Sequence, residues 1–587
     1  MCNRLLLLAL LLTAGCRAPD GVARVPASGQ DACFSSLGPL QGAGARSPLE
    51  GQAVCLEAVV SANFSGGLGG VFLQSLADDG DSATSEGLFL PRKPDAEPRL
   101  RVGDRVRVTG RMAELGDGDA TLTALLAESL AVLGSGTAPR VTVLAQAPED
   151  WERYEGMPLQ LDAPLTVSGN DGLARYGELA VSFGGRLFAP TELAPPGPQA
   201  EAIAKDNARR MIRLDDGRGQ PDPKTHWMLP GAWDDDAPLR TGSVLTGVHG
   251  VLDQRYGSYR LQVTQPLGGI DQAPRPAPPV VAGNRRIAGF NVLNLFNGDG
   301  LGGGFPTHRG AASAEQHARQ QAKLVRVVQA LDPDMAALME LENDGGGPTS
   351  AQAQFVAALN AAGPHRDWRA VQTAEGPGGD VIRVGLIYRT SRFTAVGGPA
   401  TLAEGPFAGR SRAPLAQAFR AGKGPVFVVV ANHFKSKGGC AEATGGDADA
   451  GDGQGCYSAA RVASAEALHA WLATDPTGTR PEGSLILGDL NAHAQEDPLR
   501  ALYQRGWRDA FAIAGAVRPY SYVWAGQSAR LDHALLDAGL AKRLRGAAEW
   551  HSNADESEHF DYRRDLESDP WRASDHDPVL LGLDLAR

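Results

Sequence analysis

The spacing of hydrophobic residues changes near residue 284, and this change predicts two kinds of structure in one chain. Upstream, residues 102–108 alternate valine with arginine, glycine and aspartate, which is the period of a half-buried strand. Downstream, apolar residues recur at helical spacing from Leu324 to Leu331, inside a predicted helix over 313–331. A second helix is expected at about 457–473, and strands are expected at 286–290, 335–339, 381–388, 426–431, 484–487, 531–536 and 579–583. All-β modules followed by an α/β domain are therefore predicted.

Two upstream stretches share the same signposts in the same order. Each starts on Glu-Gly, passes Asp-Asp-Gly, and reaches Leu-Arg-x-Gly before a strand that ends on glycine. We predict two β modules, 46–140 and 141–272, and the second has extra residues around 185–212 and 218–238. The pattern resembles small Greek-key barrels of the OB type, which often bind single strands or sugars. A purely structural spacer is the equal alternative, because basic and aromatic residues do not cluster in either copy.

The N-terminus has the features of an export signal peptide. Arg4 precedes an apolar run over 5–12, which is too short to span a bilayer. The following Thr-Ala-Gly-Cys resembles a bacterial lipobox, so residues 1–16 are predicted to be a lipoprotein signal and Cys16 the lipidated residue. The expected location is the cell envelope, at the outer membrane in a Gram-negative host, with membrane contact through the lipid alone. An ordinary secretory signal, which would release the protein, is the alternative.

Composition and cysteine use agree with export of a folded protein. The 587 residues carry a formal charge of −12, which argues against a polycation that coats nucleic acid. Residues 17–45 are expected to form a tether, and 273–283 a Pro-rich linker. Four cysteines remain beyond the signal, and three pairings are possible in an oxidising compartment. The sequence-local pairing, Cys33 with Cys55 and Cys440 with Cys456, is the simplest of the three.

Polar residues follow the predicted strands of the C-terminal domain at the points where those strands end. Asparagine, aspartate and glutamate oxygens suit Mg²⁺, Mn²⁺ or Ca²⁺, and histidines transfer protons near neutral pH. The chain has neither a Gly-rich phosphate loop nor a G-x-S-x-G elbow. The pattern therefore predicts metal-assisted attack of water on a phosphate diester. The residues concerned are Asn291, Glu340, His433, Asp489, Asn491, Asp532, Asp575 and His576.

Six segments carry a resemblance to a known family. FNVLNLF, LMELEND, NHFKSKGG, GDLNAHAQEDP, LDHALLD and SDHDPV stand in the order of the endonuclease/exonuclease/phosphatase superfamily. The likeness implies a four-layer α/β sandwich of two packed β-sheets over 284–587. Within the superfamily, the chain is most similar to extracellular bacterial nucleases of the ExeM kind, which also carry upstream all-β domains.

The resemblance also implies roles for single residues. Asn291, Glu340 and Asp575 look like ligands of Mg²⁺ or Mn²⁺. Asp489 looks like the residue that orients or deprotonates the attacking water, and Asn491 like a donor to a phosphate oxygen. Asp532 and His576 resemble a carboxylate–imidazole pair, and His433 resembles the second histidine, which protonates the leaving group. Lys435 and Arg383 are candidate phosphate contacts.

The sequence thus predicts an exported metal-dependent nuclease that acts on extracellular DNA, without a protein partner. One alternative is a phosphodiesterase of the same superfamily for lipid or other phosphoesters. Another is an inactive surface protein that binds nucleic acid. The loop from Cys440 to Cys456 holds three aspartates among glycines and is a candidate for structural Ca²⁺. Every predicted catalytic residue follows Gly283, so the domain beyond it is expected to fold and cut alone.

Overall fold

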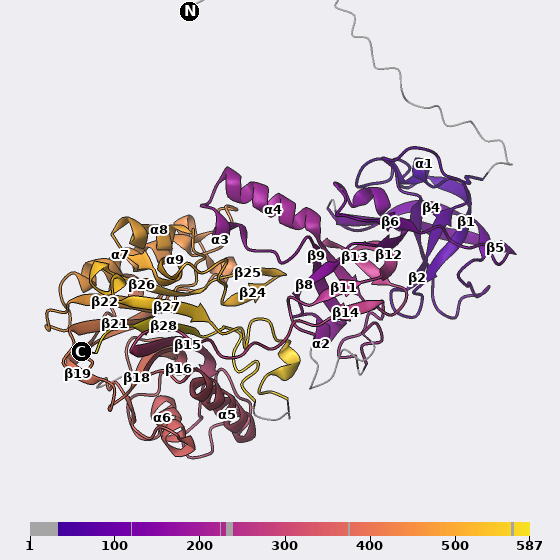
Figure 1. The fold of residues 1–587 in the computed structure, drawn as a ribbon. Coiled ribbons are helices and arrows are strands. Elements are labelled where there is room, and N and C mark those ends of the chain that lie inside the picture. Colours follow the sequence, from indigo (N-terminus) through magenta and orange to yellow (C-terminus); the bar gives the residue numbers. More distant parts are fainter. Residues whose placement is uncertain are drawn as a thin grey trace, which may run out of the picture.

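The computed structural model describes residues 33–118, 120–223, 225–229, 239–373, 376–564 and 569–586. The predicted signal, its Cys16 and the tether up to residue 32 lie outside the described residues. Within the described ranges, no helix combines the length and the apolar character needed to cross a membrane. Figure 1 shows three bodies in sequence order: a barrel, a second β module in the middle, and a larger C-terminal domain.

The first module is a closed barrel with the strand order β1-β2-β3-β5-β4, in which β1 also pairs with β4. The expected strand at 102–108 begins at Arg105, because the Leu-Arg-x-Gly segment forms a turn in which Gly103 adopts a φ of 90°. A short helix, α1 (Gly38–Gln41), precedes the barrel. The predicted all-β character is therefore observed, and the OB assignment remains a prediction. The strands are β1 (Ala53–Asn63), β2 (Gly70–Ser75), β3 (Gly87–Pro91), β4 (Arg105–Asp117) and β5 (Ala120–Gly134).

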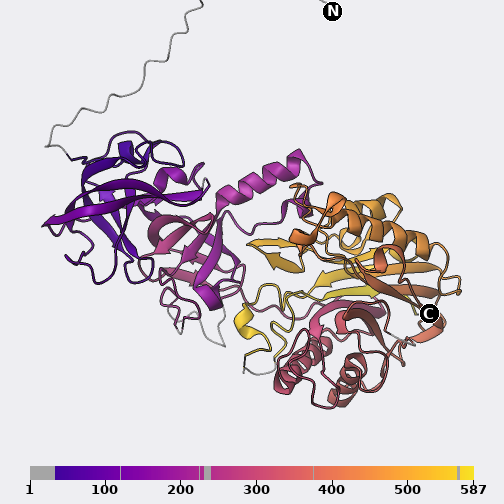
Figure 2. The same cartoon turned by 180° about the vertical axis from the view of Figure 1, so that it is seen from behind.

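The second module contains a nine-stranded sheet with the order β14-β11-β8-β9-β10-β13-β12-β7-β6. The extra residues around 185–212 form two helices that reach toward the C-terminal domain (Figure 2). Of the extra residues around 218–238, positions 224 and 230–238 lie outside the described residues. The elements are β6 (Thr142–Leu144), β7 (Pro158–Leu161), β8 (Leu165–Gly169), α2 (Leu173–Tyr176), β9 (Glu178–Phe183), α3 (Pro190–Leu193), α4 (Pro198–Arg210), β10 (Met211–Asp215), β11 (Val244–Thr246), β12 (Val248–Arg255), β13 (Ser258–Val263) and β14 (Gly269–Asp271).

The C-terminal domain is a mixed α/β fold built on two six-stranded sheets, as its alternating pattern predicts. The first sheet contains β17 (Trp368–Ala370), β18 (Ile382–Arg389), β16 (Met335–Glu342), β15 (Arg285–Leu295), β28 (Val579–Leu583) and β27 (Leu544–Glu549). The second contains β19 (Thr394–Thr401), β20 (Arg412–Arg420), β21 (Val426–His433), β22 (Gly483–Asp489), β26 (Asp532–Leu536) and β23 (Arg508–Asp509). A separate hairpin joins β24 (Tyr522–Trp524) to β25 (Gln527–Ala529).

Helices cover the outer faces of both sheets, so the central strands are buried on both sides. Figure 1 shows α5 and α6 beside the first sheet and α7 and α8 beside the second. In β22, Leu485 and Leu487 pack between the sheets, and Ile486 packs toward the helices. Burial on both faces explains the continuous apolar runs of these strands. The helices are α5 (Ala314–Leu331), α6 (Ala351–Ala362), α7 (Ser458–Leu472), α8 (Asp497–Gln504), α9 (Ala510–Ala514) and α10 (Ala538–Ala541).

Several strands were not predicted, and their sequences explain why. The strand β19, for example, reads TAVGGPAT, carries Gly-Gly-Pro and is largely exposed. It lies at an edge of the second sheet, where a missing amide donor and polar side chains are tolerated. Edge strands of this kind lack the apolar run that identified their central neighbours.

Both disulfides follow the sequence-local pairing. Cys33 bonds to Cys55 with a Cα–Cα distance of 4.6 Å, and Cys440 bonds to Cys456 with a Cα–Cα distance of 5.5 Å. The second disulfide closes the loop that precedes α7. Two such bonds indicate an oxidising environment.

Removal of the second disulfide is expected to destabilise the C-terminal domain. Closing a loop of this length restricts the unfolded chain and contributes about 3 kcal/mol in the chain-entropy model. A Cys440→Ala/Cys456→Ala variant should therefore unfold at a lower temperature in calorimetry. The matched control, Cys33→Ala/Cys55→Ala, should instead lower the transition of the barrel. An unchanged C-terminal transition in the first variant would contradict the expectation.

Candidate active site

Strand ends from both sheets meet at one edge of the sandwich. The strands β15 and β16 are parallel neighbours in the first sheet, and β21 and β22 are parallel neighbours in the second. Their carboxyl ends therefore lie side by side within each sheet. Asn291 of β15 joins the two sheets: its Nδ2 donates to Glu340 Oε1 at 3.3 Å and to Asp489 Oδ2 at 3.2 Å. The packing of the sheets thus gathers residues that are far apart in the sequence.

Two buried carboxylates form the centre of this group. Glu340 adopts a φ of 66° in β16, and its Oε2 accepts from Asn294 N at 3.1 Å. Burial raises the pKa of Glu340, and the charge of Asp575 adds to the effect. Burial also raises the pKa of Asp489, to about 7, although the nearby His576 opposes this rise. Negative charge is therefore concentrated here beyond what the neighbouring cations compensate.

His433 ends β21 and faces the same carboxylates. Its Nε2 lies 3.4 Å from Asp489 Oδ2 and 3.9 Å from Glu340 Oε1. Burial, followed by the charge of Arg412, lowers the pKa of His433 well below its usual value. The ring is therefore neutral at pH 7. Its Nδ1 is buried and has no hydrogen-bond partner in the described part of the chain.

His576 and Asp532 form the predicted pair. His576 Nδ1 and Asp532 Oδ2 are 2.7 Å apart, and Ser521 Oγ donates to the same carboxylate oxygen at 2.8 Å. His576 Nε2 lies 4.0 Å from Asp489 Oδ2. Burial disfavours the charged ring, but the carboxylate of Asp532 outweighs it, so the pKa of His576 is raised well above its usual value. At neutral pH this ring is an imidazolium, in contrast to His433.

Asn491 and Asp575 complete the predicted group from two loops. Asn491 follows β22 with a φ of 48°, and its backbone N–H donates to Asp489 Oδ1 at 2.8 Å. Its Nδ2 donates to Phe434 O at 3.1 Å. Asp575 is half-buried and accepts from Ser574 Oγ at 3.4 Å. Asp575 and Glu340, whose side chain is 18% exposed, are the acidic members most open to solvent.

The two predicted phosphate contacts lie apart from this group. Arg383 is 3% exposed, and its Nη2 donates to Gln352 Oε1 of α6 at 2.8 Å, so its guanidinium is directed toward the helix layer. Lys435 Nζ donates to Gly438 O at 3.1 Å and lies 4.0 Å from the centre of the Tyr457 ring. Neither side chain makes a hydrogen bond or ion pair to the carboxylates within the described residues.

Sequence reasoning missed residues that support the two histidines. Arg412 lies opposite His433 across β20 and β21, and its Nη1 donates to Phe434 O at 2.8 Å. The Tyr522 ring packs 4.8 Å from the His576 ring, centre to centre. Asn553 Nδ2 donates to His576 O at 2.7 Å. The segment SYVW ahead of LDHALLD could have indicated Tyr522, but Arg412 and Asn553 follow no motif that a single sequence reveals.

The donor set fits a divalent cation. Asp489 is buried and Glu340 is half-buried, and desolvation raises the pKa of both carboxylates, so a cation between them would be stabilised by two hard oxygen ligands. The amide nitrogen of Asn291 donates to both carboxylates, and Nε2 of the neutral His433 ring lies near both. Asn291, Glu340 and the nearby Asp575 would hold the ion, with Asp489 beside it.

The candidate Ca²⁺ loop has a different character. Asp447 Oδ1 accepts from Ala460 N at 2.9 Å, near the start of α7. Asp449 and Asp452 accept from backbone N–H groups two residues further on. Asp449 and Asp452 thus stabilise their own turns, and Asp447 holds the first turn of α7. In the first module, the carboxylates of Asp78, Asp79 and Glu86 lie close to one another. The carboxylate of Glu86 accepts hydrogen bonds from Leu37 N and Asp79 N.

Comparisons with known proteins show similarities in the C-terminal domain. Residues 288–576 match the model of the Endonuclease/Exonuclease/phosphatase family. No curated protein matches the sequence. A solved family member from Bacteroides vulgatus is 15% identical over 51% of this chain and 98% of its own, with a TM-score of 0.34. The human Nocturnin catalytic domain is 14% identical over 51% of this chain and 95% of its own, with a TM-score of 0.34. A mannosyl-6-phosphatase from Bacteroides thetaiotaomicron has the same identity and TM-score over 51% and 99%.

The family match concerns the C-terminal domain, where it begins at β15 and ends at His576. Members of this superfamily hydrolyse phosphoester bonds, generally with a divalent metal. The six motif segments lie within the matched residues or at their end, as the resemblance implies. The narrower likeness to extracellular nucleases of the ExeM kind stays a prediction.

Glu496, in the loop after Asn491, is expected to make the stability of the fold depend on pH. Glu496 is fully buried and bonded to Lys437 and His493, and these partners outweigh its burial and lower its pKa to about 2. A lowered pKa stabilises the fold above the unfolded value of about 4.3, and this contribution is lost as pH falls toward 2. The free energy of unfolding should thus favour the wild type over Glu496→Gln by about 3 kcal/mol at pH 7. In denaturant titrations the difference should shrink from pH 5 to pH 3. A difference independent of pH would contradict the expectation.

Proposed function

We propose that this protein is an exported, metal-dependent nuclease that hydrolyses phosphodiester bonds of DNA. The observation that carries the proposal is the convergence of Asn291, Glu340 and Asp489 with the His576–Asp532 pair at one edge of the sandwich. Hard oxygen ligands beside one charged and one neutral histidine suit the attack of water on a phosphate diester. The family match of the C-terminal domain supports the same reaction class.

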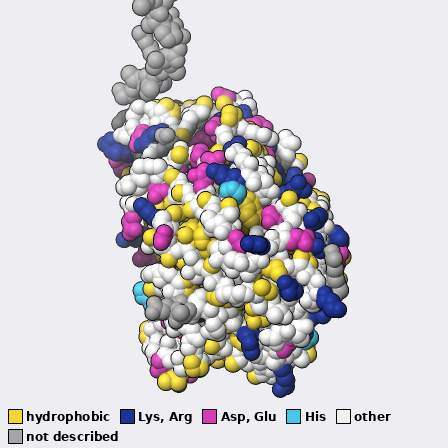
Figure 3. Space-filling view, turned by 90° about the vertical axis from the view of Figure 1, so that its left-hand side faces the viewer, with side chains coloured by type: hydrophobic (Ala, Val, Ile, Leu, Met, Phe, Trp, Pro, Cys, Tyr) yellow, Lys and Arg dark blue, Asp and Glu magenta, His cyan; other side chains and the backbone are white. Residues whose placement is uncertain are grey.

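Local cations support a polyanionic substrate despite the net charge of −12. Acidic and basic side chains are interspersed over the face drawn in Figure 3. Arg309 is exposed, and its charge, like that of Arg412, contributes to the lowered pKa of His433. These two guanidinium groups could meet phosphates beside the histidines. They replace Arg383, which points to α6, as the favoured phosphate contacts.

Each residue of the candidate site is assigned one role in the proposed reaction. Asp489 is positioned to orient the attacking water and to receive its proton. His576, held by Asp532, contributes positive charge and a proton beside the phosphate, and Asn491 offers an amide donor to a phosphate oxygen. His433 Nε2 lies 3.4 Å from Asp489 Oδ2 and keeps this carboxylate in place. Because the His433 ring is neutral, the leaving-group proton is assigned to His576 instead of to His433. A bound Mg²⁺ or Mn²⁺ would polarise the phosphate and lower the pKa of bound water.

Location and substrate belong to the same proposal. Export is supported by the N-terminal signal grammar and by the two disulfides. Lipidation of Cys16 would anchor the enzyme to the cell envelope, and cleavage as an ordinary signal would release it. The NHFKSKGG text and the upstream β modules favour nucleic acid over lipid substrates.

A digestion series tests the proposed function. Supercoiled plasmid, linear DNA, RNA and sphingomyelin are each incubated with the full chain and Mg²⁺ or Mn²⁺, with and without EDTA. We expect cleavage of DNA that stops in EDTA and returns with added metal. Full cleavage in chelator would overturn the metal-assisted reaction, and turnover of sphingomyelin alone would favour the lipid alternative.

Substitution of the histidine–carboxylate pair should reveal its role. His576→Ala should lower the rate on DNA by ~10²–10⁴, as expected for a positioned acid–base group. Asp532→Asn should lower the rate less, because the ring remains but loses its anchor. The double variant should fall by less than the product of the single effects. Wild-type turnover by His576→Ala would show that the SDHDP segment has no catalytic role.

A further inference from the structure

We infer that the second β module is a positioning element of the active site, acting through Glu192 and Arg186. This inference rests on the proposed function and adds to it a part of the chain that carries none of the predicted catalytic residues. The module contacts both loops that present catalytic side chains, the one after β22 and the one before β28. The contacts are buried and ionic, so they fix where these loops lie.

Glu192 of α3 holds the backbone around two catalytic positions. Its Oε2 accepts from Ala494 N at 3.0 Å, three residues beyond Asn491, and from Arg530 N at 3.2 Å, two residues before Asp532. Its Oε1 accepts from Arg530 Nε at 2.8 Å. The side chain of Glu192 is 4% exposed and that of Arg530 is 7% exposed. One carboxylate from the second module thus ties both catalytic strand ends together.

Arg186 reaches the other catalytic loop. Its guanidinium donates to both carboxylate oxygens of Asp555, at 2.9 and 3.1 Å, and lies 4.5 Å from the centre of the Tyr520 ring. Tyr520 donates to Asp555 at 2.8 Å and stacks on His551 with a ring separation of 3.9 Å. The His551 ring in turn bonds to Asp577, at 2.8 Å. Asp577 follows His576 directly, so this chain of contacts ends beside the catalytic ring.

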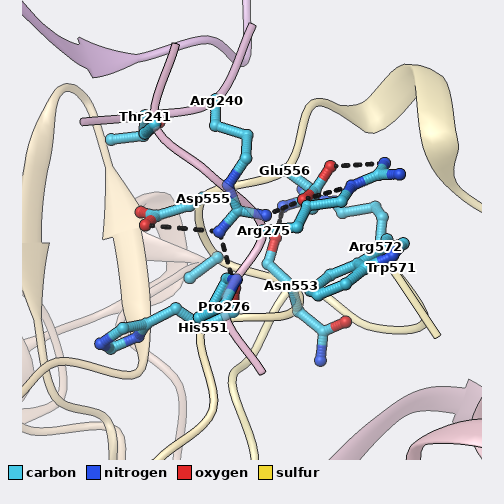
Figure 4. Close-up of polar contacts among 12 residues, drawn as sticks. Arg240, Thr241, Arg275, Pro276, His551, Asn553, Asp555, Glu556, Trp571 and Arg572 are labelled. Atoms are coloured by element: carbon cyan, nitrogen blue, oxygen red, sulfur yellow. Dashed lines mark hydrogen bonds and ion pairs between the residues drawn. The ribbon is translucent and has the colours of Figure 1, made fainter. Parts of the chain in front are cut away.

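The same loop is held from a second direction. Figure 4 shows Arg240 of the second module between Asp555 and Glu556, and Arg275 of the linker on the far side of Glu556. Arg240 is 2% exposed and Glu556 is fully buried. Arg275 Nη2 donates to Glu556 at 3.0 Å, and Trp550 Nε1 donates to Pro276 O at 2.9 Å. The Pro-rich segment is therefore packed against the catalytic domain instead of serving only as a spacer.

The β24–β25 hairpin, which packs against His576, also contacts the second β module. Phe188 forms a bridge with Ser528 of β25, and Ser528 N donates to Leu187 O at 2.9 Å. Tyr522, on the paired strand β24, packs on the His576 ring. Removal of one partner from a buried ion pair leaves a desolvated charge, which is strongly destabilising locally. The C-terminal domain alone would lack the contacts of Glu192, Arg186 and Arg240, so we expect it to cut less well than the full chain.

Full-length variants test the inference with kcat and KM measured separately. The substrate is bis(p-nitrophenyl) phosphate with Mg²⁺, because a small diester has no contact with the β modules. Glu192→Ala and Arg186→Lys should each lower kcat by ~10–100-fold, as expected for a misplacement of about 1 Å, with KM nearly unchanged. Glu192→Gln keeps an acceptor for Ala494 N and should retain more of kcat than Glu192→Ala.

The control is Glu178→Gln in the same module. Glu178 accepts from Arg260 at 2.7 Å, an ion pair internal to the second module. This variant should keep wild-type kcat, and calorimetry should show that all variants are folded. Equal kcat for Glu192→Ala, Arg186→Lys and the wild type overturns the inference, as does an equal loss in Glu178→Gln. No turnover by the wild type on any phosphodiester overturns the proposed function instead, and the inference with it.

Discussion

Burial of uncompensated negative charge is the constraint on which the rest of this structure depends. The packing of the two sheets buries Asp489 and Asp532 and half-buries Glu340 at one edge, and desolvation raises the pKa of Asp489 and of Glu340. Hydrogen-bond donors in the described chain relieve part of this cost: the amide of Asn291, the imidazolium of His576, the hydroxyl of Ser521, and the backbone N–H groups of Asn294 and Asn491. The site is thus built to accept more positive charge, from a metal ion when one is bound.

The opposite charge states of the two histidines follow from that arrangement. Burial disfavours the charged form of both rings, but His576 gains a hydrogen bond to Asp532 and stays charged. At His433 the charge of Arg412 adds to the effect of burial, and the ring stays neutral. The same residue type in one small volume therefore supplies a charged ring and a neutral ring. The difference is set by neighbours and not by the rings themselves.

Much of this arrangement could be predicted from the sequence, and the remainder has a physical reason. Most central strands were identified because burial on both faces leaves unbroken apolar runs, and residues such as Asp489 lie directly at the ends of those runs. The central strand β20 was missed, because proline and glutamine interrupt its apolar run. Edge strands such as β19 leave no such trace. Arg383 was misplaced because alternation on β18 decides which face a side chain takes, and a bulge in the neighbouring strand shifts that register. The roles of Glu192 and Arg186 were not predicted, because their partners lie more than 300 residues away in the sequence.

Ionic contacts also explain why the second module can fix the loops without being part of the sandwich. A mainly apolar interface tolerates small sliding, since hydrophobic burial has no preferred direction. Bidentate pairs such as Arg186–Asp555 are satisfied in one orientation only, and any shift leaves a buried charge unpaired. Such contacts add little net stability after the cost of desolvation, but they fix one position of the loops relative to the second module. The loops must hold Asn491 and His576 to within a fraction of an ångström. For this purpose a single fixed loop position matters more than the net stability that the contacts add.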